Sequence, residues 1–113
     1  MQAQARLRFY KGSAQKVRLV ADTVRGRGVV RALAILHLTH KRCARDLEKL
    51  VRSAVANMEQ KSPGIDSGKL VVRTIQVDQG PTLKRFRAAS MGRQSPRLHK
   101  YCHVTVQIGE REE

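Results

Sequence analysis

Cysteine and histidine are the residue types typical of a structural zinc site, and three of them cluster near the C-terminal end of this chain. They are His99, Cys102 and His103. A structural zinc site needs four ligands, so at least one more would have to come from elsewhere. The other candidates are Cys43, His37 and His40, and none has the spacing of a zinc-finger ligand. We therefore expect no metal site, with Cys102 in the core and His103 on a polar sheet face.

Residues for acid, base or nucleophilic catalysis are equally sparse. A Cys–His pair would need an orienting group and an oxyanion hole, and the sequence provides neither. Four carboxylates fall on expected helices among basic residues, where surface ion pairing is the ordinary role. They are Asp22, Asp46, Glu48 and Glu59. The Arg-Gly-Arg-Gly run at 25–28 lacks the preceding strand and the Lys-Ser/Thr of a phosphate-binding loop. We expect neither an enzyme nor a cofactor.

Positive charge is the chemistry that the sequence has in excess. There are 23 Lys and Arg against 9 Asp and Glu, which gives a formal net charge of +14 and a pI near 11.1. From Gly80 to Val106 the chain carries no Asp or Glu at all. A surface so one-sided in charge repels itself unless a polyanion lies against it. This balance indicates a nucleic-acid partner.

A membrane is the weaker reading of the same charge. The longest apolar run, 32–36, is far shorter than the ~18 residues that a spanning helix needs. The first twenty residues lack the apolar segment of a secretory signal. Two cysteines in such a basic chain are then expected as reduced thiols. We expect a cytoplasmic protein with no membrane span.

The length of 113 residues fits a single domain, 1–113, whose core must be mostly aliphatic because only 4% of residues are aromatic. Its first element is predicted as a strand with one buried and one basic face. The buried face comprises Ala5, Leu7 and Phe9, and the other comprises Arg6, Arg8 and Tyr10.

Three helices are predicted next. Ser13 caps the first, which carries an apolar stripe to Val24 and stops at 25–28. The second, 29–38, is apolar on several sides and is expected to be mostly buried, with Thr39 as the cap of the helix that follows. The third has the clearest stripe, formed by Ala44, Leu47, Leu50, Val51, Ala54, Val55 and Met58. Its outer face comprises Lys41, Arg45, Glu48, Lys49 and Arg52.

Two further strands are predicted after a loop at 62–68. In the first, 69–78, one face holds Val71, Arg73, Ile75 and Val77. In the second, Cys102, Val104, Val106 and Ile108 alternate with polar residues. The two should pair antiparallel, with the basic stretch between them as a long connection.

That connection, 79–98, is predicted to be a protruding basic β-hairpin within the domain. Each arm has about ten residues and at ~3.3 Å per residue reaches on the order of 33 Å. A domain of about 100 residues has a radius of gyration of only ~13 Å. The expected tip is Ala88, Ala89, Ser90, Met91 and Gly92, followed by Arg93.

We expect twelve cations to contact nucleic acid. Those of the N-terminal block are Arg6, Arg8, Lys11, Lys16, Arg18 and Arg25, and those of the hairpin are Lys84, Arg85, Arg87, Arg93, Arg97 and Lys100. Phe86 and Tyr101 either stack on bases or cover the base of the hairpin. The cations of the third helix are interspersed with acids, which is typical of a solvated face.

Several segments resemble the bacterial large-subunit ribosomal protein family numbered twenty-two, over about 5–106. Lys-Val-Arg-Leu-Val-Ala-Asp at 16–22 with Val-Arg-Gly at 24–26 is similar to its first-helix signature. Residues 32–36 and 53–57 look like its second and third helices. The most specific match is Val-Asp-Gln-Gly-Pro-Thr-Leu-Lys-Arg at 77–85, followed by 92–93, 95–96 and 103–106.

The resemblance implies an α+β fold, with three helices packed on a three-stranded antiparallel sheet. It implies a structural constituent of the large ribosomal subunit that binds large-subunit (23S) rRNA and contacts neighbouring ribosomal proteins. The tip, Ala88 to Arg93, would line the nascent-peptide exit tunnel, close to the growing peptide. Here Ala-Ala-Ser-Met at 88–91 replaces a tip rich in Pro and Arg, so the scaffold role is better supported than a specific peptide contact.

The alternative reading is an architectural DNA-binding protein that wraps a duplex with a basic β-arm. A measurement of molecular size and a competition between RNA and DNA would separate the two hypotheses.

Overall fold

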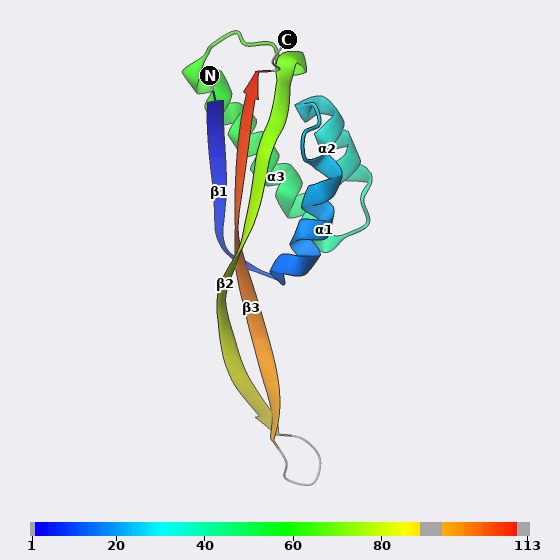
Figure 1. Cartoon of the computed structure of the whole chain (residues 1–113), viewed down its shortest axis with the longest axis vertical. Coiled ribbons are helices and arrows are strands. Elements are labelled where there is room, and N and C mark those ends of the chain that lie inside the picture. The colour runs from blue at the N-terminus through cyan, green and yellow to red at the C-terminus, as the bar shows by residue number, and fades with distance from the viewer. Residues whose placement is uncertain (1, 89–93, 111–113) are drawn as a thin grey trace.

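The computed structural model describes residues 2–88 and 94–110, without the side chains of residues 67, 84–88 and 94–99. The elements in chain order are β1 (Gln2–Lys11), α1 (Ala14–Val24), α2 (Val29–Leu38), α3 (Arg42–Lys61), a short 3-10 turn η1 (Ser67–Lys69), β2 (Leu70–Ala88) and β3 (Gln94–Glu110). The strands form one antiparallel sheet in the order β1-β3-β2, with the three helices on one side of it (Figure 1). The predicted α+β fold is confirmed.

β1 follows the predicted alternation only in its first part. Ala3 and Ala5 are buried against the helices, but Phe9, predicted on the same face, is 63% exposed. The register between β1 and β3 shifts between Leu7 and Tyr10, and Phe9 has a φ of +54°. Such a β-bulge inserts one residue and so reverses which face the next side chain takes. Tyr10 therefore turns toward α3, where its hydroxyl donates to Asp46 Oδ2 at 2.6 Å.

A second bulge corrects the prediction for β2. The register shifts between Val72 and Thr74, so that Val72, rather than Val71 and Arg73, shares the buried face with Ile75 and Val77. Arg73 lies instead over Gly109, where a Cβ atom would clash with the Arg73 guanidinium. Between Val104 and Gly109, β3 pairs with β1 without such an irregularity. Its predicted apolar residues, Cys102, Val104, Val106 and Ile108, are all buried.

The helices confirm two of the three predicted patterns. The stripe of α1 is buried, and Ser13 occupies the N-cap position although its side chain makes no capping hydrogen bond. The stripe of α3 is buried except for half-buried Val55. α2 was expected to be mostly buried, but only Val29, Ala32 and Leu36 are. Two other apolar side chains of α2, Val30 and Leu38, are 61% and 74% exposed.

Two polar positions near α3 differ from prediction. Glu48, assigned to the outer face, is only 8% exposed, because its carboxylate accepts from Arg52 Nη2 at 2.7 Å and lies 3.8 Å from His37 Nδ1. Thr39 does not begin α3: its backbone caps the end of α2, and its hydroxyl donates to the Ile35 carbonyl oxygen. Lys41 is the N-cap residue of α3 instead.

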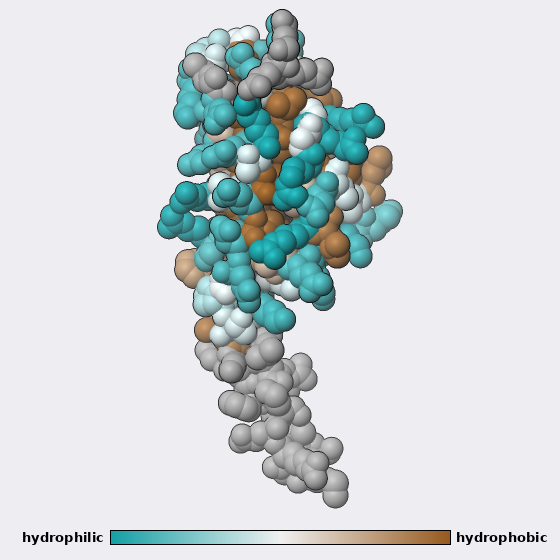
Figure 2. Space-filling view, viewed as in Figure 1, coloured by the Kyte–Doolittle hydropathy of each residue, from teal (hydrophilic) through white to brown (hydrophobic). Residues whose placement is uncertain are grey.

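The core lies between the sheet and the helices and is almost wholly aliphatic. Leu36, Met58 and Ile108 are among its largest fully buried side chains. Figure 2 shows mostly hydrophilic side chains over this part of the surface, with apolar ones between them. Within the described residues, no helix has both the length and the apolar character needed to cross a bilayer.

β2 and β3 are longer than the strand that accompanies them. β1 ends where Lys11 pairs with Tyr101, and Gly12 then donates its N–H to the Lys100 carbonyl oxygen. From Thr82↔Lys100 to Ala88↔Gln94 the described pairing is between β2 and β3 alone, and in Figure 1 this ribbon lies beyond the lower end of β1. The tip of the predicted hairpin, residues 89–93, lies outside the described residues, so the hairpin of 79–98 as a whole stays a prediction.

Two leucines of α2 allow a matched test of this core. Leu36→Ala should lower the free energy of unfolding by about 2–5 kcal/mol, because it opens a cavity at a fully buried position. Leu38→Ala removes the same atoms from an exposed position and should change stability by less than about 0.5 kcal/mol. Denaturant unfolding measures both, and equal effects would contradict the packing described for α2.

The Tyr10–Asp46 contact predicts a loss of stability at alkaline pH. Burial, and then the hydrogen bond to Asp46, raise the pKa of Tyr10 above its usual range. The unfolded chain therefore loses this proton more readily than the folded one, so stability falls as the pH rises above about 10. Tyr10→Phe should show a smaller fall in unfolding free energy between about pH 9 and 11. Lysine titration affects both proteins alike, so parallel curves would count against the contact.

Candidate nucleic-acid interface

Part of the predicted basic hairpin is placed by its backbone. The register sets Lys84 opposite Leu98, Arg85 opposite Arg97 and Arg87 opposite Ser95 in the ribbon of β2 and β3. The side chains of these residues are not described, and Arg93 lies with the tip outside the described residues. The predicted rRNA contacts of these five cations, and the stacking of Phe86, therefore stay predictions.

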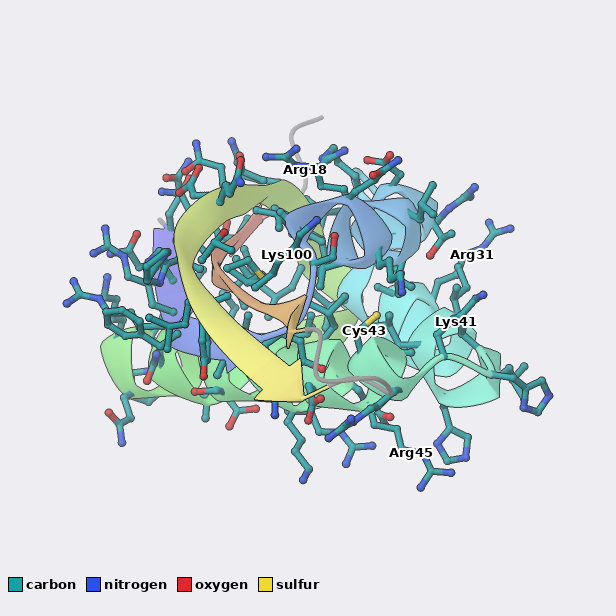
Figure 3. All side chains as sticks on the ribbon, turned by 90° about the horizontal axis from the view of Figure 1, so that it is seen from below. Arg18, Arg31, Lys41, Cys43, Arg45 and Lys100 are labelled. Atoms are coloured by element: carbon teal, nitrogen blue, oxygen red, sulfur yellow. The ribbon has the colours of Figure 1, made fainter. Side chains whose placement is uncertain are left out.

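Three predicted lysines meet where the three-stranded sheet gives way to the ribbon. Lys11 ends β1, Lys16 lies in the first turn of α1, and Lys100 lies on β3. All three are exposed and line one groove of about 610 Å³, together with Gly12, Ser13, Gln15 and Leu19. Figure 3 looks at this end of the molecule, with Lys100 and Arg18 labelled close to the sheet. We call this groove, which Lys11, Lys16 and Lys100 line, the lysine groove.

The lysine groove is electrostatically suited to an anion for a second reason. The N-terminus of α1 lies at this groove, and the first backbone N–H groups of a helix have no partner within the helix. The helix dipole places partial positive charge at the same end. The lysine side chains add full charges from three different elements, so a phosphate backbone would be attracted to this groove.

Arg6 and Arg8 form a second cationic surface, on the sheet face away from the helices. Both are exposed, and they line a groove of about 370 Å³ that reaches across all three strands. The other residues of this groove are Phe9, Gln76, Asp78, His103, Val104 and Thr105. The sequence brought Arg6 and Arg8 together correctly, but it placed Phe9 on the opposite face, because a bulge leaves no mark in the hydrophobic pattern.

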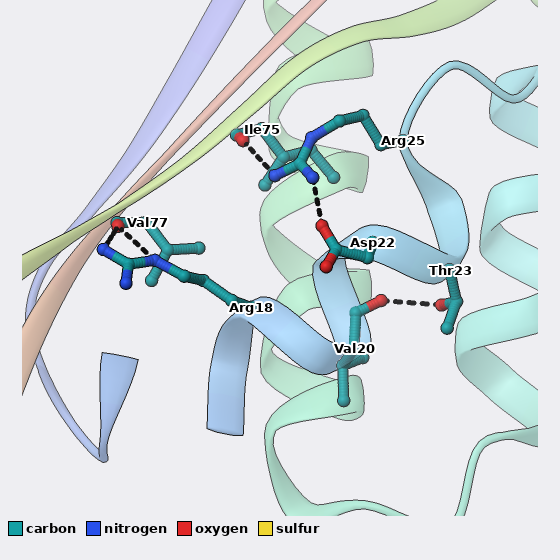
Figure 4. A network of polar contacts seen from close by, with 7 residues as sticks. All are labelled: Arg18, Val20, Asp22, Thr23, Arg25, Ile75 and Val77. Atoms are coloured by element: carbon teal, nitrogen blue, oxygen red, sulfur yellow. Dashed lines mark hydrogen bonds and ion pairs between the residues drawn. The ribbon is translucent and has the colours of Figure 1, made fainter. Parts of the chain in front are cut away.

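The remaining predicted cations, Arg18 and Arg25, have structural partners (Figure 4). Arg18 donates from Nε and Nη2 to the Val77 carbonyl oxygen, at 3.1 and 2.7 Å. Arg25 donates from Nη2 to the Ile75 carbonyl oxygen at 2.8 Å and pairs with Asp22. β2 is an edge strand, whose outward carbonyls would otherwise have only water as partner. The two arginines thus fasten α1 to the sheet, and their predicted rRNA contact stays a prediction.

Other exposed cations were not singled out from the sequence. Arg27 and Arg31 line a groove of about 510 Å³ at the start of α2. In Figure 3, Arg31, Lys41 and Arg45 point away from the helices. The charge count up to His40, with Asp22 as its single acid, was the signal that could have added Arg27 and Arg31 to the predicted set.

The two cysteines and His103 occupy ordinary structural positions. Cys102 is fully buried, as predicted, and burial raises the pKa of both the Cys43 and the Cys102 thiol, which disfavours the nucleophilic thiolate. His103 is half-buried and accepts a hydrogen bond at Nδ1 from the backbone N–H of Phe9. In the part of the chain that the structure describes, no three His, Cys, Asp or Glu residues gather as metal ligands would.

Neighbouring cations of α1 separate a structural from a surface role. Arg18→Ala should lower the free energy of unfolding by about 1 kcal/mol, because it removes both hydrogen bonds to the Val77 carbonyl oxygen at a partly buried site. Lys16→Ala removes one positive charge from the same helix without removing such a bond and should stay within about 0.5 kcal/mol. Thermal and denaturant unfolding measure both changes. Equal destabilisation would mean that the Arg18 contact contributes nothing.

Comparison with known proteins places this geometry in a family. The model of the family described as ribosomal protein L22p/L17e matches residues 5–109. The large ribosomal subunit protein uL22 of Myxococcus xanthus (strain DK1622) is 46% identical over 111 residues, covering 97% of each chain. The protein of the same name from Anaeromyxobacter sp. (strain Fw109-5) is 50% identical over 105 residues, covering 93% of this chain and 73% of that one. The chain therefore belongs to the ribosomal protein L22p/L17e family.

Proposed function

We propose that this protein binds large-subunit (23S) rRNA through the lysine groove, the Arg6–Arg8 surface and the ribbon, and that its hairpin lines the nascent-peptide exit tunnel. Its family makes it a structural constituent of the large ribosomal subunit in the cytoplasm and not an enzyme, as the sequence predicted. The observation that carries the rRNA proposal is the convergence of Lys11, Lys16 and Lys100 at the root of the ribbon.

The convergence of the three lysines matters because isolated surface lysines are common and contribute little affinity for nucleic acid. These three come from β1, α1 and β3, and they line one groove of about 610 Å³ beside the N-terminus of α1. Each phosphate that such cations neutralise releases condensed counterions, which is the main source of affinity for nucleic acid. The lysine groove therefore suits a sequence-independent grip on the RNA backbone.

The ribbon of β2 and β3 is also suited to contact with RNA. A two-stranded antiparallel ribbon is marginally stable in water. Its register places two arginines, Arg85 and Arg97, at one cross-strand position, where like charges destabilise the pairing. RNA packed on both sides of the ribbon would neutralise these charges and stabilise it. The ribbon is thus suited to a cleft between RNA segments.

The contact with the exit tunnel is the most specific part of the proposal. It rests on the family resemblance of 77–85 and 95–96, on either side of the tip, and of 92–93 within it. The tip residues, Ala88 to Arg93, are mostly small, so they suit a smooth wall past which a nascent peptide can slide. Neighbouring large-subunit proteins would then contact the surfaces of the packed helices that rRNA leaves open.

Salt dependence tests the role of the ribbon. With about six to ten phosphate contacts, affinity for a large-subunit rRNA fragment should fall by several orders of magnitude between low and near-physiological salt. Reversing Arg85 and Arg87 to Glu should flatten the slope of log affinity against log salt by about two. Filter binding across a salt series measures it.

The matched control is the reversal of Arg45 and Lys49, two exposed cations of α3, which changes the net charge equally. This control should shift the slope far less, since α3 is predicted to face solvent. Slopes that respond alike to both reversals would refute a specific role for the ribbon. Competition with duplex DNA belongs in the same series: DNA that competes as well as rRNA would support the architectural DNA-binding alternative.

A further inference from the structure

The helix-free face of the sheet carries a feature that backbone contacts with RNA do not require. We propose that the groove around Phe9 binds a single unpaired nucleotide of the RNA, with guanine preferred, its base stacked on the Phe9 ring and its phosphate at Arg6 and Arg8. The proposal rests on the proposed function, since it takes RNA as the ligand. It adds one defined site and one base preference.

Phe9 is held in an unusual conformation that presents its ring outward. Its φ of +54° lies in the left-handed region, which bulky residues rarely occupy. The bulge sets Arg8 and Phe9 together opposite His103, and the ring is 63% exposed. Strained backbone of this kind is concentrated at ligand-binding positions. A core role does not account for Phe9, because the bulge turns it away from the helices.

His103 fixes the ring from behind. The two ring centroids are 4.8 Å apart with an interplanar angle of 86°, and His103 Nδ1 accepts the backbone N–H of Phe9 at 3.0 Å. The edge contact and the hydrogen bond together orient the phenyl group while leaving most of its surface exposed. A preordered, exposed aromatic face is the platform on which unpaired bases stack.

The floor of the groove supplies hydrogen-bonding groups in register. Arg6, Thr105 and Gln76 are cross-strand neighbours in one row, and His103 and Asp78 are neighbours in the next. Asp78 is exposed at the edge strand and is the one carboxylate among the residues that line this groove. An ionised carboxylate only accepts hydrogen bonds, so it favours a base edge with donors. Guanine presents two adjacent donors, N1–H and its exocyclic amino group, which a carboxylate can accept together.

The geometry favours an unpaired nucleotide over a duplex. Paired RNA exposes a deep, narrow major groove that side chains cannot read, and sequence-specific contacts go to splayed-out bases. A groove of about 370 Å³ on an open sheet suits one base with its phosphate. Arg6 and Arg8 flank it with two positive charges against the single Asp78, so the groove remains attractive to a polyanion.

Short RNAs test the proposal on the full-length protein. Fluorescence anisotropy at low salt would compare end-labelled UUGUU with UUAUU and UUCUU. We expect UUGUU to bind at least severalfold more tightly. Phe9→Gly should weaken UUGUU about tenfold, since stacking on an aromatic ring contributes on that order per base. Phe9→Tyr should restore binding, and Asp78→Asn should abolish the preference for guanine.

Two features make these variants informative. Glycine is favoured at a φ of +54°, so Phe9→Gly should keep or raise the thermal midpoint while it loses the platform. Leu38→Ala is the matched control, because Leu38 is another exposed apolar residue, 74% accessible, that lies on α2 away from the proposed RNA-binding grooves. Its affinity for UUGUU should equal that of the unmodified protein.

The outcomes separate this site from the proposed function. Binding of the large-subunit rRNA fragment is measured in parallel for every variant. Equal affinity of Phe9→Gly and the unmodified protein for UUGUU, or no preference among the three RNAs, overturns the nucleotide site even where the rRNA fragment still binds. Failure of the unmodified protein to bind the rRNA fragment overturns the proposed function itself.

Discussion

The structure depends on the pairing of β3, which has β1 on one side and β2 on the other for only part of its length. Where both neighbours are present, every second side chain of β3 is buried against the helices, so this strand lies at the centre of the core. Where β1 ends at Lys11, the same strand keeps only β2 in the described pairing. This difference in strand length divides the sheet into a three-stranded part, stabilised by hydrophobic burial, and a two-stranded ribbon, an arrangement that is generally only marginally stable in water.

The cations divide along the same line. Arg18 and Arg25 donate hydrogen bonds to backbone carbonyls of the edge strand β2. These two cations therefore satisfy acceptors on an edge that could otherwise pair with a strand of another chain. Lys11, Lys16 and Lys100 instead surround the point where the ribbon begins. A count of charges could not distinguish these roles, because a guanidinium bonded to a carbonyl keeps its charge and remains partly exposed.

The sequence predicted what local periodicity decides and missed what pairing decides. The apolar stripes of α1 and α3 follow from the helical period, and the alternation of β3 follows from the strand period. Both patterns are confirmed by the burial of these residues. Phe9 and Val71 were assigned to the wrong faces because a bulge depends on how a strand meets its partner. Glu48 was assigned to solvent because its burial depends on Arg52 and on His37 of another helix. The three lysines were predicted singly, but their convergence is a product of the topology.

The two sheet faces show why an aromatic residue on the open one is informative. The inner face is aliphatic and is covered by the helices, whereas the outer face is lined by polar residues such as Gln4, Arg6 and Thr105. A polar outer face is sufficient to keep a one-sided sheet in solution, so folding alone does not require Phe9 there. Holding a phenyl ring at positive φ on this face disfavours the free protein on two counts, through strain and through exposed apolar surface. A residue that is unfavourable in the free protein becomes intelligible when a bound base covers it, because binding then removes the exposed surface that folding left.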